Sequence, residues 1–167
     1  IDKNSKFLYV DYEYKDINPS DTDEALKTLY KFNEFCKQHN IKFYVIITPQ
    51  KPLIYPYSKI DNDIKFKNHP YFLQQIKKAK DLNIIYPYNE FLEAKKDNYM
   101  FFKTEHHWTD DGAFIAYNLL MNKIQKDFPS VNKLQNNDFE YYYNNKVKAD
   151  FDKTFNYGSS FYYIGLP

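Results

Sequence analysis

The sequence predicts an α/β domain in which helices flank a parallel sheet. Segments with the period of an amphipathic helix alternate along the chain with short runs of β-branched and aromatic residues. Strands that alternate with helices need crossover connections, which give parallel pairing. The 167 residues suit one domain, and an aromatic content of 20% supplies enough apolar surface for a core. We therefore expect a single domain over 1–167, with the organisation of 130–167 left open.

The first half of the chain predicts a helix followed by a buried strand. Residues 19–21 are a turn and helix start, with Ser20 as the capping residue and acidic residues in the first turn, and the helix ends near His39. The apolar residues of this helix recur at steps of 4, 3 and 4, namely Ala25, Leu29, Phe32 and Cys36. The continuous apolar run 43–47 is typical of a strand that is buried on both faces.

The second half continues the alternation. The predicted elements are a helix over 70–81, a strand over 84–86, a short helix over 89–95, a strand over 99–102, and a longer helix that Thr109 caps and that ends near Lys126. Residues 130–157 are polar and rich in Asn, and their pattern assigns no element.

The composition excludes several classes of function. There are 23 basic and 22 acidic residues, a net charge of +1, and no Arg, which argues against a nucleic-acid partner. Three Gly residues leave no glycine-rich nucleotide loop, and the single Cys36 excludes an internal disulfide or a cysteine-rich metal site. We expect no cofactor and no metal.

The ends of the sequence suggest a piece of a longer protein. The chain begins at Ile1 rather than Met, so a signal peptide or membrane anchor upstream is compatible with it. It stops at Pro167 without a closing helix. Within it, no apolar run reaches the roughly 18 residues that a membrane span needs.

Two polar loops directly follow predicted strands. Residues 48–51 follow the strand over 43–47, and residues 103–108 follow the strand over 99–102. In open parallel sheets, binding sites form outside the carboxyl ends of the strands. The sequence therefore predicts that these two loops share one edge of the domain.

Glu105 and His107 form the most informative pair in these loops. In an extended segment, residues two apart point the same way, so this carboxylate and imidazole share a side. A carboxylate that holds one ring N–H leaves the other nitrogen free to accept a proton from a hydroxyl. The alternative is a loop histidine bonded to the backbone. A metal site is less favoured, since His106 and His107 diverge in an extended chain.

The block Thr104-Glu105-His106-His107-Trp108-Thr109, followed by Gly112-Ala113, resembles the Asp-x-His-Trp block of the SGNH-hydrolase-like O-acetyltransferases. These are the alginate acetyltransferases and the related family named for its DHHW motif. The segment Thr48-Pro49-Gln50-Lys51 with Ile54-Tyr55-Pro56 is similar to the Pro-x-Lys…Tyr-Pro segment of the same family. The resemblance covers about residues 25–125, and it implies an SGNH-like, flavodoxin-like fold.

The resemblance also implies a serine nucleophile served by a histidine and an acid. By position in the motif, His107 matches the base, and Glu105 matches its acid partner, where the family has Asp. The segment Gly158-Ser159-Ser160-Phe161 matches the nucleophile block, which makes Ser160 the candidate nucleophile. In that block, Ser159 stands where the family has Asp. Alternatively, this segment matches a Phe-x-Gly-Ser stretch of the family that is not the nucleophile block. The serine would then lie outside this chain or be missing.

The resemblance further implies a cell-envelope enzyme that acetylates hydroxyls of a polysaccharide. The acetyl donor would come from a membrane acyltransferase partner, and the location would be periplasmic or otherwise extracytoplasmic. Lys51, Trp108 and Tyr55 are the candidate substrate-binding residues. A carbohydrate acetylesterase and a non-catalytic glycan-binding or scaffold domain are the alternatives.

Overall fold

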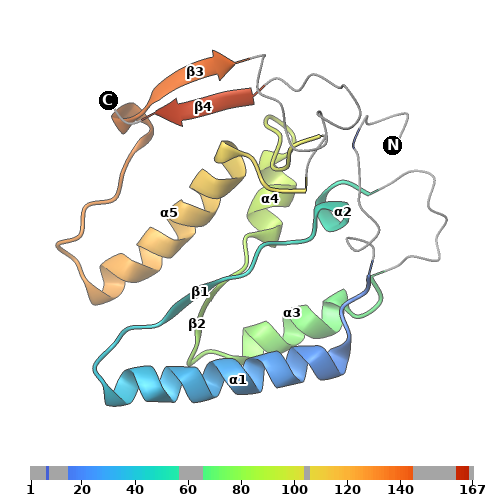
Figure 1. Cartoon of the computed structure of the whole chain (residues 1–167), viewed down its shortest axis with the longest axis vertical. Coiled ribbons are helices and arrows are strands. Elements are labelled where there is room, and N and C mark those ends of the chain that lie inside the picture. Colours follow the sequence, from blue (N-terminus) through green and yellow to red (C-terminus); the bar gives the residue numbers. More distant parts are fainter. Residues whose placement is uncertain (1–6, 8–14, 57–65, 104–105, 145–160, 166–167) are drawn as a thin grey trace.

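The structure is a computed structural model that describes residues 7, 15–56, 66–103, 106–144 and 161–165. Its elements follow the predicted alternation of helices and strands (Figure 1). In chain order they are α1 (Pro19–Gln38), β1 (Tyr44–Ile46), α2 (Lys51–Ile54), α3 (His69–Lys78), β2 (Asn83–Ile85), α4 (Tyr88–Ala94), α5 (Asp110–Asp127), the 3-10 helix η2 (Asn136–Asp138), β3 (Glu140–Asn144) and β4 (Phe161–Gly165).

The strands β1 and β2 pair in parallel and lie between two layers of helices (Figure 1). On one side α1 packs beside α3, and Leu26 of α1 forms a buried cluster with Ala79 and Leu82 just before β2. On the other side α5 packs against both strands. The predicted α/β class, with helices flanking a parallel sheet, is confirmed.

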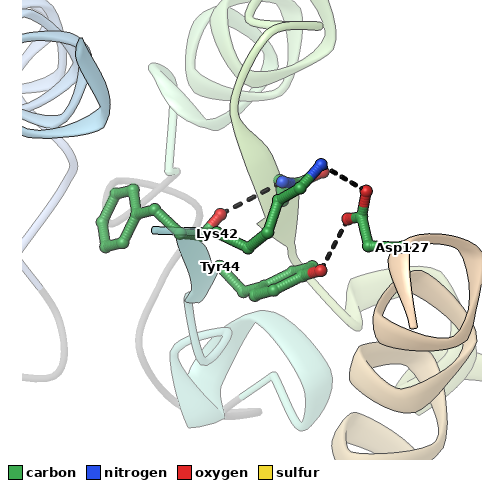
Figure 2. A network of polar contacts seen from close by, with 5 residues as sticks. Lys42, Tyr44 and Asp127 are labelled. Carbon is green, nitrogen blue, oxygen red and sulfur yellow. Dashed lines mark hydrogen bonds and ion pairs between the residues drawn. The ribbon is translucent and has the colours of Figure 1, made fainter. Parts of the chain in front are cut away.

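A polar network fixes the beginning of β1 to the end of α5 (Figure 2). The Lys42 ammonium lies 2.5 Å from one carboxylate oxygen of Asp127, and the Tyr44 hydroxyl donates to the other at 2.6 Å. These two hydrogen bonds hold the pKa of Asp127 below its ordinary value. Burial, reinforced by the bond to Asp127, raises the pKa of Tyr44 to about 12. Because Tyr44 is the first residue of β1, this network lies at the opposite end of the strand from the loop 48–51.

The cap of α1 differs from the prediction. Asn18, one residue before Pro19, is the capping residue, and its side chain accepts from the Ser20 backbone N–H at 3.0 Å. The Ser20 hydroxyl donates to the same Asn18 oxygen at 2.9 Å. Pro19 then takes the first helical position, where its missing N–H costs nothing.

The buried face of α1 is rotated relative to the predicted one. Phe32 is 50% exposed. The buried residues of the helix are Thr22, Leu26, Asn33 and Cys36. Asn33 belongs inside because its side-chain amide donates to the Asp81 carbonyl at 3.2 Å, a contact between distant parts of the chain that apolar periodicity does not reveal.

The predicted strand over 99–102 is wrong. Its one β-bridge is antiparallel and joins Phe101 to Trp108, so the segment folds back on the loop that follows it. The Phe102 N–H bonds to the His107 carbonyl at 3.1 Å, and the Met100 N–H to the Tyr55 hydroxyl at 3.0 Å. Backbone groups that a neighbouring parallel strand would need are therefore already paired.

Three further elements, the helix α2 and the strands β3 and β4, escaped the sequence patterns. The short helix α2 begins at Lys51, and Pro52 occupies its first turn, where proline is tolerated. Near the end of the chain, β3 and β4 pair antiparallel, with Glu140 opposite Gly165 and Asn144 opposite Phe161, and β4 contacts α5. Of the helices that the structure describes, none combines the length and apolar character that crossing a bilayer requires.

Candidate functional site

A cavity of about 300 Å³ lies between the two polar loops. Its lining consists of Thr48, Pro49, Gln50 and Lys51 from the loop after β1, and of Phe101, His106, His107 and Trp108 from the segment before α5. The prediction that these loops share one edge of the domain is confirmed. The volume is at the lower end of the range for small-molecule sites.

The segments 100–102 and 107–109, on the two sides of the second loop, pair with each other and form a narrow, hairpin-like return of the chain. The bridge between Phe101 and Trp108 is flanked by the bond from Phe102 to His107 and by a bond from the Thr109 N–H to the Met100 carbonyl at 3.0 Å. This pairing brings both ends of the loop together. It therefore determines where His106 and His107 lie relative to the loop after β1.

The first turn of α5 fits tightly against the base of this return. The Thr109 side chain accepts from the Gly112 N–H at 3.2 Å and donates to the Tyr99 carbonyl. A Cβ on Gly112 would lie 2.6 Å from the Met100 carbonyl oxygen and 3.3 Å from the Cβ of Trp108. Only glycine permits this close approach, which explains the Trp-x-x-x-Gly spacing of the motif.

His107 is exposed at the cavity, and His106 is partly buried beside it. The two imidazole rings lie 4.0 Å apart between centroids, with their planes tilted by 35°. The expectation that these neighbouring side chains diverge is wrong, because the chain bends at 106–107 instead of remaining extended. Both histidines therefore contribute to one lining. Even so, no group of three or more His, Cys, Asp or Glu side chains suited to a metal ion occurs among the described residues.

Lys51 is a buried residue of the lining, only 1% exposed. Its ammonium lies 3.5 Å from the Lys103 carbonyl and 5.3 Å from the centre of the Phe7 ring. This lysine therefore links the loop after β1 to the beginning of the second loop. A positive charge at this depth is unusual for a loop lysine, which is ordinarily solvated.

Tyr55 and Trp108 occupy different positions around the cavity. Trp108 lines it and also packs against the core cluster of Ile54, Phe91, Met100 and Phe101. Tyr55 lies outside the lining. Its hydroxyl accepts the Met100 N–H, its ring stacks on Phe7 with centroids 4.4 Å apart, and burial raises its pKa. In this position Tyr55 supports the hairpin-like return.

Two of the predicted catalytic residues, Glu105 and Ser160, lie outside the described residues. Of the lining residues, the sequence motifs indicate Lys51, His107 and Trp108 but not Phe101 or His106. Phe101 is apolar, and no sequence pattern distinguishes it from an ordinary core residue. An extended chain would point His106 away from His107, and only the bend at 106–107 brings both rings to the cavity.

Solved structures of other proteins share this fold. The chain superposes on Bacillus cereus PatB1 with a sulfonyl adduct at a TM-score of 0.74 and 21% identity, covering 98% of this chain and 55% of that one. A second PatB1 structure gives a TM-score of 0.63 and 20% identity over 92% of this chain and 54% of that one. The O-acetyltransferase domain of Pseudomonas putida AlgJ gives 0.65 and 17%, over 98% of this chain and 63% of that one.

This chain thus spans a little over half the length of these solved relatives. No curated protein sequence gives a significant match. A family model does match, over residues 5–160 and hence nearly the whole chain. The chain belongs to the family of that model, the SGNH hydrolase-like domain of the acetyltransferase AlgX.

Proposed function

We propose that this chain is a domain that transfers acetyl groups to hydroxyls of a cell-envelope polysaccharide. The observation that carries the proposal is the exposed imidazole of His107 in a cavity of about 300 Å³ that the two motif-bearing loops enclose. Membership of the acetyltransferase AlgX family supports the reaction class. Because the chain spans about half of its solved relatives, the complete active site includes whatever the rest of such a protein contributes.

The proposed chemistry is a two-step acyl transfer. The Ser160 hydroxyl oxygen attacks the acetyl carbonyl while His107 accepts its proton, and Glu105 holds the other ring nitrogen in the donating tautomer. The donor's oxygen departs with that proton and leaves an acetyl-serine. A glycan hydroxyl then attacks the acetyl-serine, with His107 again as the base, and this releases the serine and the O-acetylated sugar.

Lys51 and Trp108 are the proposed substrate-binding residues within the cavity. The buried ammonium of Lys51 orients an acetyl or sugar oxygen, since its charge acts in a weakly solvated environment. Trp108 offers a ring against which a sugar packs. Tyr55 acts on the substrate indirectly, through the return that it supports.

Two partners complete the proposal. The acetyl donor is presented by a membrane acyltransferase, and the acceptor is a polysaccharide outside the cytoplasm. Family membership supports both partners. The absence of Arg and of a basic excess disfavours nucleic acid as the polymer bound.

A chromogenic acetyl ester tests the chemistry. Turnover of 4-nitrophenyl acetate should fall by about a hundredfold or more in His107→Ala and in Ser160→Ala, since each removes a group on which the other depends. His39→Ala is the matched control because His39 is an exposed imidazole at the end of α1, and it reports ester hydrolysis by imidazole in general. Equal turnover in all four proteins would refute the enzymatic proposal.

The acceptor is identified separately, by mass spectrometry of a glycan incubated with the ester and the protein. Acetylated sugar is the expected product. Release of acetate without acetylated sugar would assign the domain as an esterase.

A further inference from the structure

Beside the cavity, three aromatic rings form a row. The ring of Phe7 stacks on that of Tyr55, with centroids 4.4 Å apart, and meets the ring of Tyr99 edge-on at 6.0 Å. Each ring has one lysine ammonium over it: Lys95 at 5.8 Å from Tyr55, Lys51 at 5.3 Å from Phe7 and Lys103 at 4.3 Å from Tyr99.

The outermost ring of this row is open to solvent. Tyr99 is 53% exposed, whereas Phe7 is 2% exposed. The Lys103 ammonium over Tyr99 is not in an ion pair with any carboxylate of the described residues. An exposed tyrosine ring therefore lies beside an ammonium that has no carboxylate partner among the described residues.

This pair is continuous with the cavity. Tyr99 precedes the lining residue Phe101 by two residues, a separation of about 7 Å in extended chain. The Lys103 carbonyl accepts from Lys51, which also belongs to the lining. A ligand that fills the cavity and extends past Phe101 towards the preceding residues therefore reaches Tyr99.

We propose that Tyr99 and Lys103 form a subsite for the sugar unit next to the one whose hydroxyl enters the cavity. The C–H face of a sugar ring packs on an aromatic ring, and sugar oxygens accept hydrogen bonds from an ammonium group. The subsite rests on the proposed function, since it needs a glycan in the cavity. It adds a preference for a chain over a single sugar and leaves the chemical step unchanged.

Binding as a function of chain length tests this subsite. Trp108 is the one tryptophan in the chain and lines the cavity, so its fluorescence reports occupancy there. The probes are N-acetylglucosamine with its β-1,4-linked di- and tetramer, and galacturonic acid with its di- and tetramer. In the unmodified chain, at least one series should bind about fivefold more tightly as dimer than as monomer, the factor expected for one ring-stacking contact.

Three variants separate the stacking from general damage. Tyr99→Ala should abolish the gain from monomer to dimer while leaving monomer affinity unchanged, and Tyr99→Phe should keep the gain because the ring remains. Phe35→Ala is the matched control: Phe35 is 51% exposed, but it belongs to α1.

The outcomes distinguish this subsite from the proposed function. If sugars change the fluorescence of Trp108 but Tyr99→Ala keeps the full gain with chain length, the subsite is refuted and the glycan cavity stands. If neither series perturbs Trp108, both the subsite and a glycan in this cavity are refuted. A smaller gain in Lys103→Gln than in the unmodified chain would support the ammonium as the second part of the subsite, and an unchanged gain would restrict the subsite to Tyr99.

Discussion

The replacement of Gly112 by alanine perturbs the base of the candidate site in a way that the structure quantifies. The added Cβ would lie 2.6 Å from the Met100 carbonyl oxygen, so α5 must move by about 0.7 Å to reach an ordinary C–H···O distance of about 3.3 Å. The Phe91 ring and the Trp108 Cβ, both at 3.3 Å, limit that movement. Overpacking of this kind costs about 1–3 kcal/mol.

A helical alanine recovers part of this cost. Replacing glycine in a helix gains about 0.5–1 kcal/mol in backbone entropy, so the middle of the two ranges gives an expected net loss for Gly112→Ala of about 1 kcal/mol. For a chain of this size, that loss lowers Tm by about 2–4 °C. The displacement also moves Trp108 in the cavity lining, so its fluorescence in the folded state should change.

The assay is unfolding in urea, monitored by circular dichroism and by the fluorescence of Trp108. The control is Ala113→Gly, in the same turn of α5, which measures the helix-propensity contribution with reversed sign. If Gly112→Ala is as stable as the unmodified chain or more stable, the close approach to Met100 does not constrain the motif, and the explanation of the Trp-x-x-x-Gly spacing is wrong.

Three other perturbations have definite outcomes. Thr109→Ala should lose about 1 kcal/mol of unfolding free energy in urea, while Thr109→Ser should keep most of it because the hydroxyl still caps α5; equal loss in both would contradict the cap. Asp127→Asn should lower the free energy of unfolding at neutral pH, and the difference from the unmodified chain should shrink as the pH falls. The reason is that a carboxyl whose pKa is lowered in the folded state stabilises the fold above its unfolded pKa, and this stabilisation is lost as the pH drops through the folded pKa. In the same variant, the NMR signal of the Tyr44 ring should titrate at a pKa below about 12, because burial still raises this pKa but the hydrogen bond to the Asp127 carboxylate is lost; no change would mean that the network of Figure 2 does not persist in solution. His69, whose pKa burial lowers, should make the fold less stable as the pH falls below about 6.5, the unfolded value; His69→Phe should flatten that dependence, and an unchanged pH profile would contradict it.

Local signals predict the four longer helices, α1, α3, α4 and α5, and the position of the site, but not the short helix α2. The capping threonine and the apolar spacing of α5 are properties of neighbouring residues, and α5 begins and ends within one residue of its predicted limits. The rule for carboxyl ends of parallel strands correctly places the cavity at the loop after β1. The second loop reaches the same cavity although the segment before it pairs antiparallel with residues after the loop and is no parallel strand.

Features that depend on contacts between residues far apart in the chain could not be predicted from the sequence. Asn33 is buried because of the Asp81 carbonyl, and β3 pairs with a segment about 20 residues further along the chain. The segment 99–102 has the composition of a strand, but the Tyr55 hydroxyl and the loop 107–109 take its backbone hydrogen bonds. Such competition between partners depends on the assembled fold, which propensity and periodicity do not encode.

Covalent labelling with phenylmethylsulfonyl fluoride tests the central proposal, that His107 activates a serine at this cavity. A serine oxygen displaces fluoride only where a base removes its proton, so peptide mass spectrometry of the labelled protein locates the activated residue. We expect a sulfonyl group on Ser160 in the unmodified chain and in His39→Ala, and none in His107→Ala. An unlabelled Ser160, or equal labelling in His107→Ala, would contradict it.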